Sequence, residues 1–394
     1  MDEKEYLQTL GEQIVNPHAR ASILAEIQDH IEEQAQDYRA SGMSEAVAMQ
    51  EAVRQMGDPV STGEALNQVH RPKFPIALFG LAVVLTVLGI AMQYLVYTHL
   101  TPDTAILSDT YLQRTILYNA IGLGLLLLCI FGNYMYLAKG AWILLAIFLL
   151  GLLPPWFFGF YGRQYTLCYY LALVYPLVYA LLLYRLRDKG AKAIWFLHGL
   201  TLLFLVRMLF GTIITWSTVL AAGCLTLLLL CLAIHRGILT GSSKRTLWLL
   251  TVLPYVAAAA CFVILFFQNS YMRDRLTEFL KGSNYVQQML ALEQQQMLAF
   301  GGGTISSYVD TESLASTYVL HSIFLWFGIV SGILVIVALA VLVLRSLHYA
   351  LHQSNRLALL AGTAASGILL FELLHFVLTN LGCSPVYTAS VPFL

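Results

Sequence analysis

Nine apolar runs of roughly 20 residues each dominate the sequence after residue 74. A helix of that length crosses the hydrocarbon core of a bilayer, which is about 30 Å thick. The chain is 58% hydrophobic and 11% charged, whereas soluble domains are roughly 25% charged. The sequence therefore predicts an all-α polytopic membrane bundle with spans at about 75–97, 114–137, 140–160, 165–184, 193–213, 215–235, 246–268, 318–344 and 357–381.

Residues 1–70 differ sharply from the apolar runs. They contain 13 Asp and Glu against 4 Lys and Arg, whereas the rest of the chain contains 9 against 18. Apolar positions recur at helical spacing, and Ser44 and Gly57–Asp58–Pro59 are start and stop signals of a third helix. We expect a small soluble bundle of three helices and a short fourth at 62–69, whose acidic run DHIEEQAQDY is either a solvated face or a docking surface for a partner.

The positions of Lys and Arg predict the orientation of the chain. They gather in every second connection, together with the basic hinge at 71–74, which favours a cytoplasmic N-terminal domain and a membrane domain at 75–394. The N-terminus is acidic and helical, so we predict no signal peptide. The long polar segment 269–317 then lies outside, and the chain stops at SVPFL, where a tenth helix would begin.

Motifs for cofactor chemistry are not found in the sequence. The six cysteines form no CxxC pair and lie mostly in apolar runs, which is typical of apolar packing residues. There is no Walker loop, HExxH or GxSxG motif. We predict no cofactor, no metal site and no nucleic-acid partner.

Two stretches carry resemblances to known families. The segment from YLQTLGEQI to EAVRQMGDP resembles the small helical permease-prefix domain, which precedes membrane segments in several bacterial protein types and indicates little about activity. The stretch RDRLTEFLKGSNYVQQMLALEQQQMLAFGGG and the closing TNLGCSPVYTASVPFL resemble the SEDS family, the FtsW/RodA/SpoVE membrane proteins of cell division, cell shape and peptidoglycan synthesis. That family has ten spans and a large outer loop between spans seven and eight.

The SEDS resemblance implies an activity and a catalytic position. The family polymerises lipid II, and an outward-facing carboxylate acts as general base on the attacking sugar hydroxyl. Alignment from LWFGIVSG places that position at Thr317, which cannot serve as a base near neutral pH. Asp310 and Glu312 are the nearest acids and therefore the alternative catalytic candidates. A divalent metal is expected only if the protein is an active enzyme.

Two other family motifs are also altered. Their glutamate, lysine and aspartate fall on Leu167, Tyr170 and Leu209. The resemblance therefore implies a degenerate active site.

Six polar residues are the candidates for binding a lipid pyrophosphate. An arginine inside a span is costly unless it meets a cavity or a partner, so Arg207 is either a pyrophosphate ligand or an interfacial residue. Glu372 and His375 share a helix face and could pair with each other or with His321. The remaining three lie on an expected amphipathic segment along the outer membrane surface, where they would meet headgroups or anchor the interface: Arg273, Arg275 and Lys281.

Three functions are consistent with these features. The first is a SEDS-like protein of the bacterial cytoplasmic membrane that binds lipid II, and a transpeptidase synthase partner, with impaired or absent glycosyltransferase activity. The second is an active lipid II-polymerising enzyme that uses Asp310 or Glu312. The third is a transporter of a lipid-linked precursor, for which no clear inverted repeat is found.

Overall fold

The computed structural model describes residues 2–14, 17–70, 75–100, 105–132, 135–153, 164–211, 216–302 and 317–384. The described residues form helices and turns, without a strand. They divide into two compact units, Met1–Ile76 and Ala77–Leu394. This agrees with the all-α class expected from the apolar runs.

The N-terminal unit contains four helices, α1 (Glu3–Gln13), α2 (Pro17–Ala40), α3 (Glu45–Gln55) and α4 (Pro59–His70). Asp2 caps α1 by accepting from the Glu5 amide at 2.7 Å, and Asp58 accepts from the Ser61 amide at 2.9 Å at the start of α4. The fourth helix begins earlier than expected because Pro59 is suited to a first helical position. Ser44 is the N-cap of α3, although its side chain makes no capping bond.

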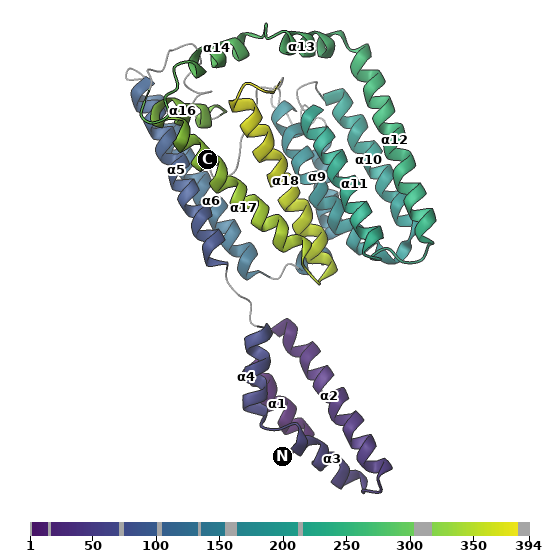
Figure 1. Cartoon of the computed structure of the whole chain (residues 1–394). Helices are drawn as coiled ribbons and strands as arrows, with labels where there is room; N and C mark the ends of the chain where they lie inside the picture. Colours follow the sequence, from purple (N-terminus) through teal and green to yellow (C-terminus); the bar gives the residue numbers. More distant parts are fainter. Residues whose placement is uncertain are drawn as a thin grey trace. The chain divides into compact units, whose positions relative to one another are not determined.

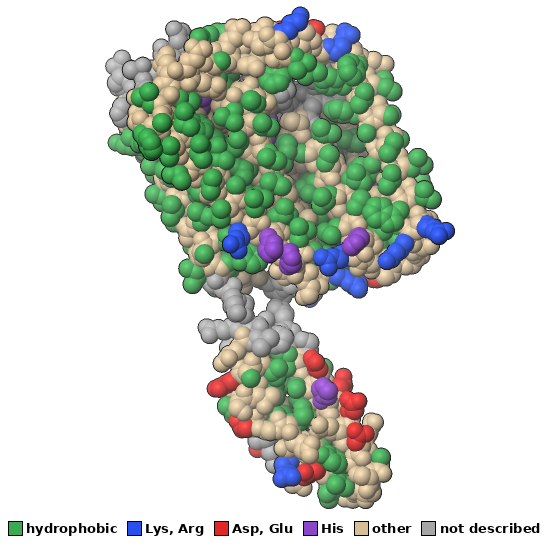
Figure 2. Space-filling model, in the orientation of Figure 1, with side chains coloured by type: hydrophobic (Ala, Val, Ile, Leu, Met, Phe, Trp, Pro, Cys, Tyr) green, Lys and Arg blue, Asp and Glu red, His purple; other side chains and the backbone are tan. Residues whose placement is uncertain are grey.

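The core of this unit is small and apolar. Tyr6 and Leu10 of α1, with its C-cap Ile14, pack with residues of α2 and α3. Burial raises the pKa of the Tyr6 phenol, which stays protonated and donates to the Met56 carbonyl at 3.1 Å. The predicted acidic run is exposed along α2, where red side chains gather in Figure 2.

Among the residues that the structure describes, the second unit contains seven helices that are long and apolar enough to cross a membrane. Two shorter apolar helices accompany them, α8 (Ala141–Gly151) and the Tyr169–Arg185 part of α9 (Gln164–Arg185). A five-residue helix, α7 (Met135–Lys139), precedes α8. The seven long helices are α5 (Ile76–Leu100), α6 (Ala105–Phe131), α10 (Ala191–Gly211), α11 (Trp216–His235), α12 (Lys244–Gln268), α17 (Ile329–Leu351) and α18 (Arg356–Asn380).

Helix α18 lies at the centre of the membrane unit, where it contacts α9, α11, α16 and α17. One apolar cluster joins α8–α11 with α18, and a second joins α5, α16, α17 and α18. Within the first, the rings of Tyr175 and Phe204 stack at 4.3 Å, and the Tyr175 hydroxyl hydrogen-bonds to the Thr201 hydroxyl at 2.6 Å. The Tyr175 hydroxyl, a buried polar group on a span, is thus paired inside the bundle.

The two ends of the membrane unit differ. Helices α13 (Ser270–Leu280) and α14 (Tyr285–Gln294) run across one end, as Figure 1 shows. The opposite end holds the α9–α10, α11–α12 and α17–α18 connections, and Lys, Arg and His side chains gather there in Figure 2. Among the described residues, that basic end has one acid, Asp188, and ten cations: Lys139, Arg185, Arg187, Lys189, Lys192, Arg236, Lys244, Arg245, Arg345 and Arg356.

The span predicted at 318–344 is not one helix. It begins as α16 (Val319–Phe327), breaks at Gly328 and continues as α17, which runs to Leu351. Gly328 has a φ of 90°, in the region that favours glycine, and an added Cβ would lie 2.7 Å from the Ala299 carbonyl oxygen. A hydropathy pattern does not report such a break, since both sides of it are apolar.

Candidate functional site

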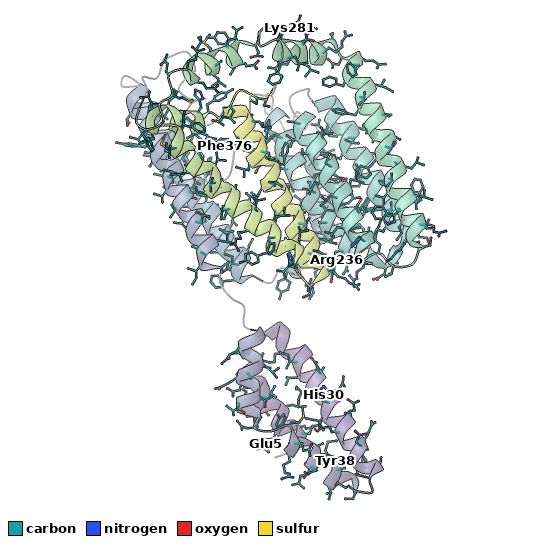
Figure 3. All side chains as sticks on the ribbon, viewed as in Figure 1. Glu5, His30, Tyr38, Arg236, Lys281 and Phe376 are labelled. Atoms are coloured by element: carbon teal, nitrogen blue, oxygen red, sulfur yellow. The ribbon has the colours of Figure 1, made fainter. Side chains whose placement is uncertain are left out.

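Helices α13 and α14 form a strap over one end of the membrane unit. A turn at Gly282 joins them, and Asn284 caps α14 by accepting from the Val286 amide at 3.0 Å. The predicted cations Arg273, Arg275 and Lys281 lie on this strap; Arg273 and Lys281 are exposed and Arg275 is half-buried. Figure 3 shows Lys281 at the outer edge of the molecule.

The expected apolar side of α13 is only partly covered. Leu276 and Phe279 are half-buried, as an amphipathic surface helix requires, whereas Leu280 is 73% exposed.

A buried hydrogen-bonded pair ties the strap to the bundle. Glu293 of α14 lies 2.8 Å from the Nε2 atom of His321 on α16, and their side chains are 1% and 0% exposed. Gln294 adds a second link by donating to the Leu381 carbonyl at 3.2 Å. These contacts are far apart in sequence, and they hold the α14 end of the strap against α16 and the C-terminal end of α18.

Asn380 connects the same junction to the end of α18. Its side-chain oxygen accepts from the His321 amide at 2.9 Å, and its side-chain nitrogen donates to the Phe376 and Thr317 carbonyls at 2.8 and 3.0 Å. Thr317, the position of the family acid by resemblance, therefore lies in this junction. The suggested pairing of His321 with Glu372 or His375 is wrong, because Glu293 holds His321.

Glu372 and His375 lie deeper in α18. The two are 7% exposed each, and Glu372 accepts from the Tyr169 hydroxyl at 3.4 Å while His375 stacks on Phe371. The suggested Glu372–His375 ion pair is not formed. Glu372 is eight residues before Asn380, which places it about 12 Å below the strap end at 1.5 Å per residue.

Arg207 lies four residues before the end of α10, in the same half of the bundle. Its Nε atom donates to the Leu152 carbonyl at 2.7 Å, and Leu152 is the C-cap of α8. A cation at a helix C-terminus satisfies an unpaired carbonyl and is favoured by the helix dipole. The structure thus gives Arg207 a contact that caps α8, near the end of α10.

Two imidazole nitrogens in this half have no hydrogen-bond partner among the described residues. They are Nδ1 of His321 and Nε2 of His375, both buried atoms. Buried polar atoms are nearly always paired, so such atoms in a polar region are candidates for contact with a ligand or water. The face is hollowed below α13 in Figure 2.

The catalytic candidates Asp310 and Glu312 lie outside the described residues. Within the described parts of the chain, no group of three His, Cys, Asp or Glu side chains is arranged to hold a metal ion. Sequence reasoning missed Glu293 and Asn380. The only available signal was an acid within a glutamine-rich run and an asparagine directly after an apolar span.

Comparison with known protein families gives a match within the N-terminal unit. Residues 5–61 are similar to the HAAS family, which covers most of the N-terminal unit. No curated protein matches the chain.

Proposed function

We propose that this is a SEDS-like protein of peptidoglycan synthesis in cell division or cell shape. It would bind lipid II, or a related polyprenyl-pyrophosphate lipid, beneath the α13–α14 strap, with impaired or absent glycosyltransferase activity. In this proposal the chain spans the bacterial cytoplasmic membrane nine times, with the permease-prefix-like unit in the cytoplasm and a transpeptidase synthase as partner. The resemblance of residues 273–303 to the family loop motivates it.

The observation that carries the proposal is the polar half-bundle below the strap. His375 and His321 each have a buried ring nitrogen without a partner among the described residues, and Glu372 is buried beside Tyr169. Polar groups inside a membrane are costly and commonly mark a substrate path. The exposed cations of α13 and the following turn lie at the same end, where a pyrophosphate headgroup would be attracted.

The orientation is supported by the basic end of the bundle. The described residues of that end include ten cations and one acid. Positively charged loops remain preferentially in the cytoplasm. The strap, at the opposite end, would then face outward. A lipid II headgroup displayed on the outer leaflet would meet the strap rather than the basic end.

The surroundings of Thr317 support a loss of catalysis. A general base must reach the proton that it removes, and threonine has no basic group. The Thr317 carbonyl is also held by Asn380. Asp310 and Glu312 remain the candidates for an active enzyme.

A binding experiment tests the proposal directly. Fluorescent lipid II is titrated into the purified full-length protein in nanodiscs, with His375→Phe as the test variant and His235→Phe, at the opposite end of the bundle, as control. Because a hydrogen bond to a charged group contributes about 1.5–3 kcal/mol, we expect His375→Phe to weaken binding about tenfold or more. Equal affinities of wild type and both variants, or no binding, would contradict the proposal.

A polymerisation assay separates the catalytic alternative. Labelled lipid II and a divalent metal are supplied to the same protein. Glycan polymer that disappears in Asp310→Ala or Glu312→Ala would establish the enzyme and overturn the non-catalytic proposal. Binding of lipid II without formation of polymer would support the non-catalytic proposal.

Transport is a second candidate, favoured by the buried Glu372 and by the helix break at Gly328, since transporters commonly place broken helices at their sites. Its test is uptake of labelled lipid-linked precursor into proteoliposomes. Uptake that is lost in Glu372→Gln supports transport, and uptake that persists contradicts a role for Glu372.

A further inference from the structure

An exposed stripe runs along one face of α17 and ends in three cationic or titratable side chains. Leu334, Val337, Val341 and Leu344 are 63%, 51%, 45% and 54% exposed. Spacings of three and four residues place successive members on one helix face. The stripe continues at the basic end with Arg345, His348 and His352, which are also exposed.

The polar part of this stripe is preorganised. The rings of His348 and His352 lie 4.2 Å apart, and the Nδ1–H group of His352 donates to the His348 carbonyl at 2.8 Å. That bond leaves the Nε2 edge of His352 facing away from the backbone. Arg345 makes no ion pair with a carboxylate among the described residues. An arginine beside two imidazole rings that can donate hydrogen bonds, without an acid close by among the described residues, favours an anion.

The stripe has the dimensions of one leaflet. Leu334 and Arg345 are eleven residues apart, or about 16 Å along the helix at 1.5 Å per residue. Half of a hydrocarbon core of about 30 Å is similar in length. A groove of about 350 Å³ lies where the apolar and cationic parts meet, lined by Val341, Leu344, Arg345 and His348.

We propose that this face of α17 binds one anionic glycerophospholipid. Its phosphate lies between Arg345 and His348, and an acyl chain follows Leu344, Val341 and Val337 toward Leu334. The charge of this end favours an anionic occupant. Its described residues include one acid, Asp188, and ten cations, and basic residues at a membrane interface attract anionic headgroups. The site is separate from the half-bundle below the strap, and it does not rest on the function proposed above.

Lipid retention tests the proposal. The full-length protein, in mild detergent, is titrated with phosphatidylglycerol or phosphatidylcholine, and bound lipids are counted by native mass spectrometry. The test variant is Arg345→Gln, and Arg245→Gln on α12 removes the same charge from the same end. Since one cation near an anionic surface contributes on the order of 1 kcal/mol, we expect about fivefold weaker phosphatidylglycerol binding in Arg345→Gln only.

A conservative variant and two further probes complete the test. Arg345→Lys keeps the charge and should stay within about twofold of wild type, which controls for folding. Equal retention of phosphatidylcholine, or equal losses in Arg345→Gln and Arg245→Gln, would overturn the site. Saturation by inorganic phosphate alone would overturn the acyl-chain part, and a dimer broken by Arg345→Gln would replace the lipid with a second copy of the chain.

Discussion

At the scale of single residues, the Glu293–His321 pair is the contact that we expect to contribute most to the stability of the strap. Both side chains lack exposed surface and their nearest atoms are 2.8 Å apart. Removing one partner of a buried hydrogen bond is destabilising, because the remaining polar group stays unsatisfied in a low-dielectric site. The exposed His30–Glu33 pair, at 3.8 Å, has the same chemistry in water and is a matched comparison.

A double-mutant cycle on these two pairs follows from that contrast. We expect Glu293→Ala and His321→Ala each to cost about 1–3 kcal/mol in unfolding free energy, because each leaves a buried polar group without its hydrogen-bond partner, with a coupling above about 1 kcal/mol between them. The same cycle on His30 and Glu33 should give a coupling near zero, since exposed pairs contribute little. Thermal unfolding of the purified protein measures both cycles, and additive losses at Glu293 and His321 would contradict the buried pair.

At the scale of elements, the break between α16 and α17 holds the segment that follows the strap. The Ile329 and Val330 amides at the start of α17 donate to the Leu298 and Ala299 carbonyls, at 2.9 and 3.2 Å. These bonds satisfy helix-terminal amides that would otherwise lack partners. Close approach of the two backbones requires the missing side chain of Gly328.

Substitution of Gly328 tests this close approach. Gly328→Ala should cost more than the 1–3 kcal/mol expected of a positive φ alone, because its Cβ would meet backbone atoms 2.7–2.8 Å away. Gly301→Ala is the matched control, with a φ of 82° and no atom within 4 Å of an added Cβ. Hydrogen exchange at the Ile329 and Val330 amides should accelerate in Gly328→Ala only. Equal losses of stability and equal exchange rates in the two variants would show that the positive φ alone explains the cost, without the close approach of the two backbones.

The elements also show how far sequence reasoning reaches. Apolar runs located the long helices because hydropathy over about 20 residues reports burial in a bilayer directly. They did not locate the break at Gly328, which depends on carbonyls that the chain supplies thirty residues earlier. The amphipathic α13 was predictable from its own periodicity, whereas the partners of His321 and Arg207 depend on tertiary contacts.

At the scale of the whole molecule, sidedness is the property that the proposed function requires. Ser283 lies in the turn between α13 and α14, and Ser354 lies in the α17–α18 connection at the basic end; both are exposed. In a Cys383→Ser background, an impermeant maleimide added to intact spheroplasts should label Ser283→Cys but not Ser354→Cys. The reverse pattern would place the strap in the cytoplasm. Detergent-solubilised protein, in which both cysteines react, is the control.

The central claim is that a lipid-linked pyrophosphate sugar binds in the half-bundle below the strap. The most direct measurement is photo-crosslinking of a diazirine-labelled lipid II to the full-length protein in nanodiscs, followed by peptide mapping. We predict adducts on α13, α14 and the last ten residues of α18, which unlabelled lipid II prevents. Adducts confined to the basic end of the bundle, or adducts that excess lipid II does not reduce, would contradict the account.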